Sequence, residues 1–135
     1  MPMSNRLAKE LALLKTVFPD VEFHEVDSGW FRIPRYTVQY GDWKQTEVAV
    51  CFQVPGGYPG DAPYAFWVSP PLRQAGNDAA PANNYQEPSL TPFSGTWGKF
   101  SWSHEAGWKS AAEPAAGSNF LHFVLTFRDR FREGP

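Results

Sequence analysis

The segment from residue 47 to residue 63 constrains the fold more than any other part of the sequence. Its first half alternates between hydrophobic and other residues, as expected of a β-strand with one face in the core. The side chains on that face are Val48, Val50, Phe52 and Val54. Its second half, 55–63, contains three prolines and three glycines. Because proline has no backbone N–H to donate, the chain leaves the sheet here and returns as a short strand at 64–68.

Earlier residues also favour β-structure. Residues 21–26 and 30–33 predict a hairpin around the turn at 27–29, and alternating Tyr36, Val38 and Tyr40 predict a further stretch of strand. We therefore expect about four antiparallel strands that follow one another as a meander.

Both ends of the sequence show helical periodicity. Ser4 can cap a helix at 4–18, and Ser118 can cap another at 118–132. The apolar stripes are Leu7, Leu11, Leu14 and Phe18 in the first helix, and Phe120, Phe123, Val124, Phe127 and Phe131 in the second. Two helices and a meander make an α+β fold. Its predicted core includes Val50, Phe52, Phe123 and Phe127.

A long irregular segment lies between the predicted sheet and the last helix. Residues 70–116 are rich in Pro, Gly, Ala, Asn and Ser, yet they carry large aromatic rings. These are Tyr85, Phe93, Trp97, Phe100, Trp102 and Trp108. A disordered linker seldom contains so many rings. We interpret the segment as a flap anchored to a single domain that spans 1–135.

Composition excludes several function classes. With 12 basic and 14 acidic residues the net charge is -2, which gives no basic field for a nucleic acid. No run of about 18 apolar residues predicts a membrane span, and no signal-peptide core is visible, so we expect a cytoplasmic protein. The single cysteine cannot form an internal disulfide or a cysteine-rich zinc site. We expect no metal, since nothing in the spacing of His24 and His122 favours one, and no cofactor, because no nucleotide-binding motif occurs.

Two short motifs, Tyr58-Pro59 followed by Pro63 and the segment 108–112, together resemble motifs of the ubiquitin-conjugating-enzyme (UBC) family. Tyr58-Pro59 followed by Pro63 is similar to the Tyr-Pro-x-x-x-Pro turn after the third strand of that family. The segment 108–112, Trp-Lys-Ser-Ala-Ala, is similar to the Trp-Ser-Pro-Ala segment ahead of its crossover helix. The resemblance implies a UBC-like fold in which Tyr58 and Pro59 pack beneath an active-site flap. An ordinary proline-rich turn is the alternative interpretation.

The sequence departs from the UBC pattern at the catalytic residues. No His-Pro-Asn motif occurs between Leu72 and Trp108, and the position expected for the catalytic cysteine falls near Lys99 or Phe100. The only thiol, Cys51, lies on the strand at 47–54, where its neighbours supply no charge to stabilise a thiolate. We therefore predict a structural role for Cys51.

Residues 100–108 contain the densest group of side chains that could take part in catalysis. His104 and Trp108 resemble a His and Trp pair in bacterial UBC-like proteins that lack the cysteine and occur beside ubiquitin-like proteins. His104 could activate Ser101 or Ser103 as an acyl acceptor. The alternative, which we favour, is a structural histidine in a flap that Trp102 and Trp108 anchor to the core. Trp102, His104 and Trp108 are predicted to cluster against the Tyr58-Pro59 turn.

Three functions follow as hypotheses. The first is a non-catalytic module of a bacterial ubiquitin-like conjugation system that binds the modifier or its adenylating (activating) enzyme through Tyr58, Pro59, Trp102 and Trp108. The second is an atypical enzyme that carries an acyl group on His104 or a nearby serine. The third is a protein-interaction adaptor unrelated to ubiquitin chemistry. Absence of the catalytic cysteine favours the first.

Overall fold

The first helix begins at the predicted cap. The computed structural model describes residues 4–38, 40–103 and 107–135. Within these ranges α1 spans Asn5–Lys15, and the hydroxyl of Ser4 accepts a hydrogen bond from the backbone N–H of Leu7 at 3.1 Å. The helix ends three residues earlier than predicted, because the hydroxyl of Thr16 donates to the carbonyl of Leu13 at 2.6 Å and closes the last turn.

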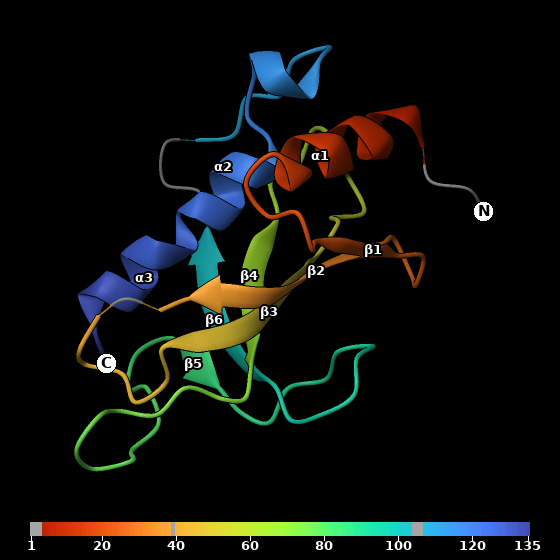
Figure 1. Cartoon of the computed structure of the whole chain (residues 1–135). Coiled ribbons are helices and arrows are strands. Elements are labelled where there is room, and N and C mark those ends of the chain that lie inside the picture. The colour runs from red at the N-terminus through yellow and green to blue at the C-terminus, as the bar shows by residue number, and fades with distance from the viewer. Residues whose placement is uncertain (1–3, 39, 104–106) are drawn as a thin grey trace.

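The sheet has six strands. They are β1 (Glu22–His24), β2 (Trp30–Thr37), β3 (Glu47–Gln53), β4 (Tyr64–Ser69), β5 (Tyr85–Gln86) and β6 (Gly98–Ser103). All neighbours pair antiparallel in the order β1-β2-β3-β4-β6-β5 (Figure 1). The prediction of four strands is wrong in number because the segment 70–116 supplies β5 and β6. Phe100 of β6 pairs with Phe66 of β4, so the flap extends the sheet.

Strand β2 joins two stretches that the sequence separates at Pro34. The register with β3 shifts between Ile33 and Tyr36, which is a β-bulge or similar irregularity in the ladder. Such an irregularity accommodates a proline that cannot donate a ladder hydrogen bond. The hydrophobic alternation therefore continues through the proline as one strand.

The last helix is divided. After the short 3₁₀ helix η1 (Pro114–Ala116), the chain forms α2 (Phe120–Leu125) and α3 (Phe127–Glu133) rather than one helix at 118–132. Asn119 caps α2 by accepting a hydrogen bond from the N–H of His122 at 2.9 Å. At Thr126, between the two helices, the hydroxyl donates to the carbonyl of Phe123 at 2.6 Å, a local bond that often bends a helix.

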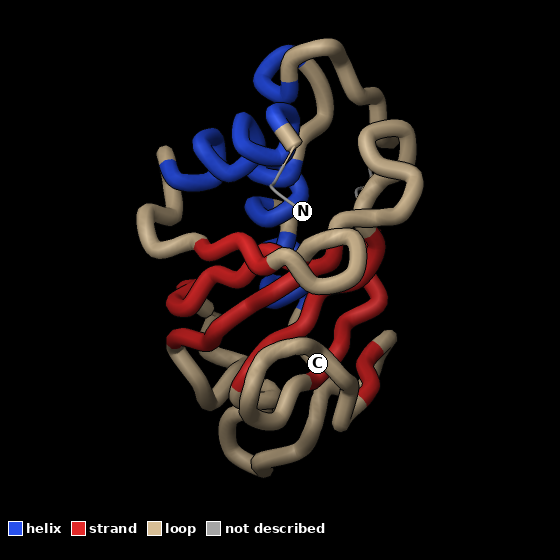
Figure 2. The backbone as a smooth tube through the Cα atoms, turned by 90° about the vertical axis from the view of Figure 1, so that its right-hand side faces the viewer, coloured by secondary structure: helices blue, strands red, loops and turns tan. Residues whose placement is uncertain are grey.

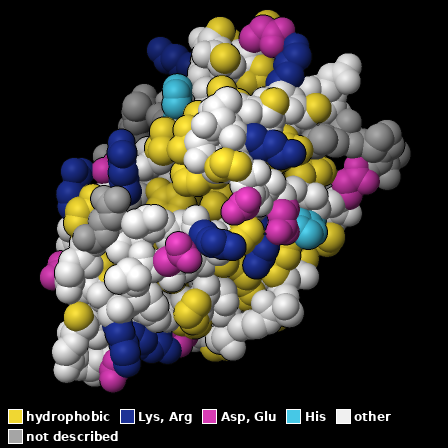
Figure 3. Space-filling model, viewed as in Figure 1, with side chains coloured by type: hydrophobic (Ala, Val, Ile, Leu, Met, Phe, Trp, Pro, Cys, Tyr) yellow, Lys and Arg dark blue, Asp and Glu magenta, His cyan; other side chains and the backbone are white. Residues whose placement is uncertain are grey.

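The helices cover one face of the sheet, and Figure 2 shows long loops on the other side. The helix-covered face is built mainly from phenylalanine rings that are fully buried. They are Phe31, Phe52, Phe66, Phe100, Phe120, Phe123, Phe127 and Phe131. The predicted core residues Val50, Phe52, Phe123 and Phe127 are all confirmed as buried. On the surface in Figure 3, basic and acidic side chains are interspersed.

The loop-covered face carries a second, smaller cluster. It consists of Trp30, Cys51, Ala65, Trp67 and Trp97, with Ala49 and Phe93 packed against it. The rings of Trp30 and Trp67 lie 4.9 Å apart. Small side chains at positions 49 and 51 of β3 leave room for these indoles. The flap therefore covers a core of its own.

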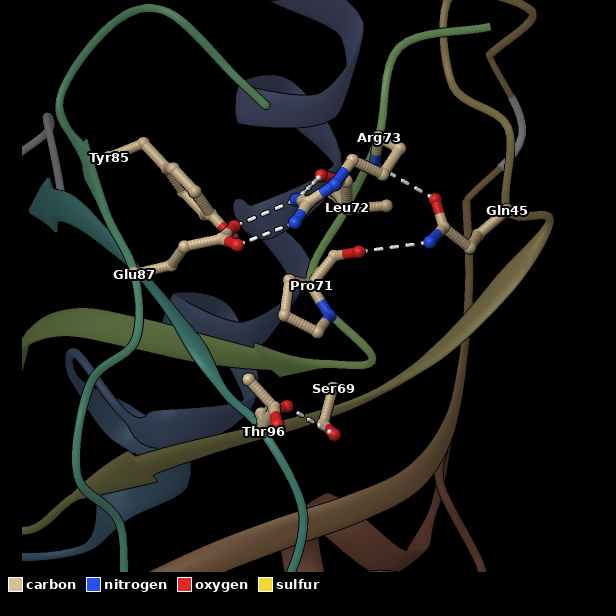
Figure 4. A network of polar contacts seen from close by, with 8 residues as sticks. All are labelled: Gln45, Ser69, Pro71, Leu72, Arg73, Tyr85, Glu87 and Thr96. Atoms are coloured by element: carbon tan, nitrogen blue, oxygen red, sulfur yellow. Dashed lines mark hydrogen bonds and ion pairs between the residues drawn. The ribbon is translucent and has the colours of Figure 1, made fainter. Parts of the chain in front are cut away.

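Polar contacts stabilise the flap, both within it and between it and the sheet (Figure 4). Arg73 donates to both carboxylate oxygens of Glu87, at 2.7 and 2.5 Å, and the hydroxyl of Tyr85 donates to the same carboxylate at 2.6 Å. The hydrogen bonds from Arg73, followed by that from Tyr85, lower the pKa of Glu87. Further along, the hydroxyl of Ser69 donates to the carbonyl of Thr96 at 2.8 Å. These contacts join two parts of the flap to each other and bind its middle to β4.

Candidate functional site

The Tyr58-Pro59 turn lies against the start of α2. The ring of Tyr58 packs on Phe120, the first residue of that helix, with ring centroids 4.9 Å apart. The indole N–H of Trp108 donates to the carbonyl of Pro59 at 2.8 Å, and its ring lies 6.2 Å from the Phe120 ring. Tyr58 and Trp108 are half-buried, whereas Pro59 is exposed. We call Tyr58, Pro59 and Trp108 the turn surface.

A polar network holds this turn to both helices. The guanidinium of Arg6 on α1 donates to the hydroxyl oxygen of Tyr58 at 3.0 Å, and that hydroxyl donates to Glu10 at 2.8 Å. The other carboxylate oxygen of Glu10 accepts from the backbone N–H of Phe120 at 3.0 Å. Arg6 also donates to the carbonyl of Ala112 at 3.1 Å. One carboxylate therefore links α1, the turn and the first residue of α2.

Burial sets the protonation of this network. Removal from water raises the pKa of Glu10, while the hydrogen bonds from Phe120 and Tyr58 and the charge of Arg6 oppose that rise. Burial and the adjacent Glu10 raise the pKa of Tyr58. The Tyr58 hydroxyl consequently keeps its proton at neutral pH and donates a hydrogen bond to the carboxylate. Arg6, Glu10 and Tyr58 therefore hydrogen-bond to one another and have a structural role in holding the turn.

Trp102 belongs to the helix-covered core. It lies on β6, is 9% exposed, and its indole N–H donates to the hydroxyl of Thr126 between α2 and α3 at 3.0 Å. Of the three residues predicted to cluster with the Tyr58-Pro59 turn, the structure shows Trp108 bonded to it. His104 lies outside the described residues.

The chain's thiol is on the other face of the sheet. Cys51 is fully buried within the loop-covered cluster, and burial raises the pKa of its thiol. At the position expected for a catalytic cysteine, Phe100 is fully buried and the ammonium of Lys99 lies over the Trp67 ring at 5.4 Å. Ser101 and Ser103 alternate with the buried Phe100 and Trp102 along β6, and they lie on its opposite face.

Neither of the other histidines forms part of a metal centre in the described parts of the chain, where no group of three or more metal-binding side chains comes together. The ring of His24 pairs with Glu22 at 2.8 Å, and Glu22 also accepts from Arg32 at 3.1 Å. Among the same described residues, no helix has the length and apolar character needed to cross a membrane.

Arg6 and Glu10 were not identified from the sequence. A signal for Glu10 exists, because it follows Leu7 by three residues and precedes Leu14 by four, which places it on the apolar side of α1. A carboxylate at such a position is expected to find a buried partner. No comparable pattern marks Arg6.

Comparison with protein-family models identifies the family to which this chain belongs. The model for prokaryotic E2 family E matches residues 14–116, which includes the sheet, the Tyr58-Pro59 turn and Trp108. The match covers most of the chain, so the chain belongs to this family and is a prokaryotic protein of the ubiquitin-conjugating-enzyme-like class. No curated protein and no solved structure matches it.

Proposed function

We propose that this chain is a non-catalytic component of a bacterial ubiquitin-like conjugation system, and that it binds the modifier or its activating enzyme through the turn surface. Membership of the prokaryotic E2 family supports a role in ubiquitin-like conjugation. The partners and the absence of catalysis are the parts of the proposal that experiments must decide. The proposal places the protein in the cytoplasm, where the ATP that adenylation of a modifier consumes is present.

The position of Cys51 carries the proposal. A conjugating enzyme needs an accessible thiolate, because the thiolate is the nucleophile that accepts the acyl group. Here the thiol is fully buried, and its burial disfavours the thiolate. The position near Phe100 offers no replacement among the described residues. Acyl transfer through His104 or a nearby serine is the alternative that the experiments must distinguish.

The turn surface has the properties of a protein-binding patch. Tyr58 and Trp108 each bury one side of a ring on Phe120 and leave part of it exposed beside Pro59. Aromatic rings with a fixed position give large contact area at little cost in conformational entropy. The network of Arg6 and Glu10 fixes the Tyr58 ring before any partner arrives.

Binding without ATP tests the proposal. Titration calorimetry of the chain with the cognate modifier, and separately with the activating enzyme, should detect a complex with at least one of them. Trp108→Ala should weaken that complex by about 30-fold, the effect of removing an aromatic anchor worth about 2 kcal/mol.

Leu90→Ala is the matched control. Leu90 is 94% exposed in the flap, so its loss removes a large apolar side chain without touching the turn surface. Binding should be unchanged in this variant. If neither protein binds, or if Trp108→Ala and Leu90→Ala behave alike, the turn surface is not the docking site.

A further inference from the structure

A hollow on the helix-covered side is bounded by the end of α1, the second half of β2 and the α2–α3 junction. Its volume is about 310 Å³. The rings of Tyr36 and Phe18 stack in it, 5.6 Å apart and 19° from parallel. The hydroxyl of Tyr36 donates to the carbonyl of Val124 at 2.8 Å, which fixes this ring. Val17, at its edge, is 49% exposed. The hollow therefore offers solvent a surface that is partly apolar and partly polar, and Val17 is the most exposed apolar side chain of its described lining.

Two arginines line the hollow. Arg35 on β2 and Arg128 on α3 are both exposed, and the guanidinium group of neither forms a hydrogen bond or an ion pair with any residue that the structure describes, although the backbone of Arg128 hydrogen-bonds to Tyr36. Each other arginine donates at least one hydrogen bond within the molecule. These others are Arg6, Arg32, Arg73, Arg130 and Arg132. The two guanidinium groups without an internal partner therefore share one site.

The charge of the hollow is positive although the chain as a whole is negative. Its described lining contains these two cations and no acidic side chain, whereas the net charge of the chain is -2. Asp129, next to Arg128 in sequence, accepts a hydrogen bond from Arg132 at 2.8 Å. Figure 3 shows apolar side chains gathered on this side of the molecule, with basic side chains near them.

The two arginines and the apolar side chains beside them indicate which kind of ligand fits the hollow. A guanidinium group matches the planar geometry of a carboxylate and binds it through two parallel hydrogen bonds. The rings and Val17 suit a large apolar side chain beside that carboxylate. A phosphate or nucleotide site usually adds lysine or backbone N–H donors at a helix N-terminus, and no lysine is part of the described lining.

We propose that this hollow binds an acidic segment of a partner protein, in which carboxylate side chains alternate with large apolar ones. Arg35 and Arg128 hold the carboxylates, and the apolar side chain rests on Val17 and Phe18. The site is separate from the turn surface. Arg6 contacts Tyr58 near the start of α1, whereas Val17 and Phe18 follow its end, and a helix of 11 residues is about 16 Å long. The proposal therefore stands whether or not the turn surface binds its partner.

The probe is a fluorescein-labelled peptide, Gly-Asp-Phe-Asp-Leu-Asp-Gly, and its counterpart has Asn in place of each Asp. Fluorescence anisotropy should show that the acidic peptide binds at least about tenfold more tightly than the amide peptide, since charge-assisted hydrogen bonds are lost in the latter. The difference should shrink at high salt, because the arginines are exposed. Failure of the acidic peptide to bind at about 1 mM would overturn the proposal.

Two double variants test whether the peptide binds in the hollow. The double variant Arg35→Gln with Arg128→Gln should bind the acidic peptide at least about tenfold more weakly. The control, Lys15→Gln with Lys109→Gln, removes the same net charge at exposed positions outside the lining and should keep the affinity within about threefold. Equal losses in the two double variants would show non-specific attraction and contradict the proposal. So would displacement of the peptide by inorganic phosphate at constant ionic strength, since phosphate would then be the preferred ligand.

Discussion

The two faces of the sheet are closed by different means. On the helix-covered face, phenylalanine rings from strands and helices contact one another, and the ring of Phe127 stacks on Phe66 at 3.9 Å. On the loop-covered face, tryptophan rings contact the sheet, but polar bonds hold the covering segment in place. One such bond runs from the indole of Trp67 to the hydroxyl of Ser89 at 2.9 Å, and another runs from the hydroxyl of Ser69 to the carbonyl of Thr96 at 2.8 Å.

This difference separates global from local stability. Loss of a ring from the helix-covered face leaves a cavity that the surrounding sheet and helices cannot fill, so the whole fold is weakened. Loss of an anchor on the loop-covered face releases a segment whose own core is small, so the opening is local. The following substitutions test that comparison, beginning with the largest expected effect.

Phe127→Ala should lower the free energy of unfolding by about 3 to 5 kcal/mol, because the ring is fully buried between Phe66 and Phe123. Urea denaturation followed by tryptophan fluorescence measures the change. Phe93→Ala, on the half-buried ring of the loop-covered face, should cost only about 1 to 2 kcal/mol. Equal costs for the two variants would remove the distinction between the faces.

Glu87→Gln should cost about 1 to 2 kcal/mol, since a charged acceptor of three hydrogen bonds becomes a neutral amide at a partly exposed site. The pKa of Glu87 is lowered, so its stabilisation is present above the ordinary value of 4.5 and is lost as the pH falls through the lowered pKa. Hydrogen exchange should accelerate in residues 85–97 and stay unchanged in α2. Uniform acceleration would contradict a local role.

Cys51→Ala should cost about 1 kcal/mol and leave partner binding intact, because the thiol is a small buried group in the loop-covered cluster. Cys51→Ser should be worse, since its hydroxyl would be buried among apolar side chains. In the folded wild type the thiol should resist Ellman's reagent and react after unfolding. Rapid reaction of the native protein would show an accessible thiol and reopen its role as a nucleophile.

The smallest expected effect is a pH dependence centred on Glu10. Its pKa is raised, so its contribution to stability is fully present below the ordinary value of 4.5 and declines as the pH rises through the raised pKa. This sign is opposite to that of Glu87. The stability of the wild type relative to Glu10→Gln, measured by urea titration at a series of pH values, should fall as the pH rises. A constant difference would mean that burial does not govern this carboxylate.

Periodicity predicted the helix-covered face well. Repeats such as Phe120, Phe123 and Phe127 reveal buried stripes because the spacing itself encodes the face. The loop-covered face was harder, since β5 has two residues and β6 becomes a strand by pairing with β4, a contact between distant parts of the sequence. The break at Thr126 likewise depends on a side-chain hydrogen bond that threonine forms in some helices and not in others.

The candidate site could be predicted from the sequence where a family motif was present. The Tyr58-Pro59 turn and Trp108 could be paired through the family resemblance, whereas Trp102 turned out to be a core residue. Arg35 and Arg128 could not be found, because exposed arginines have no periodic signal and these two meet only through the fold. Local sequence patterns therefore located the residues of the turn surface, whereas they gave no signal for the two arginines of the separate hollow.

Intact-mass spectrometry tests the central claim most directly. The chain is incubated with its cognate activating enzyme, modifier and ATP, alongside the His104→Ala variant and a reaction without ATP. The account predicts that the mass of the chain stays unchanged while non-covalent binding is retained. A mass increase equal to the modifier less one water, dependent on ATP and abolished in His104→Ala, would contradict the account and identify the chain as an acyl-carrying enzyme.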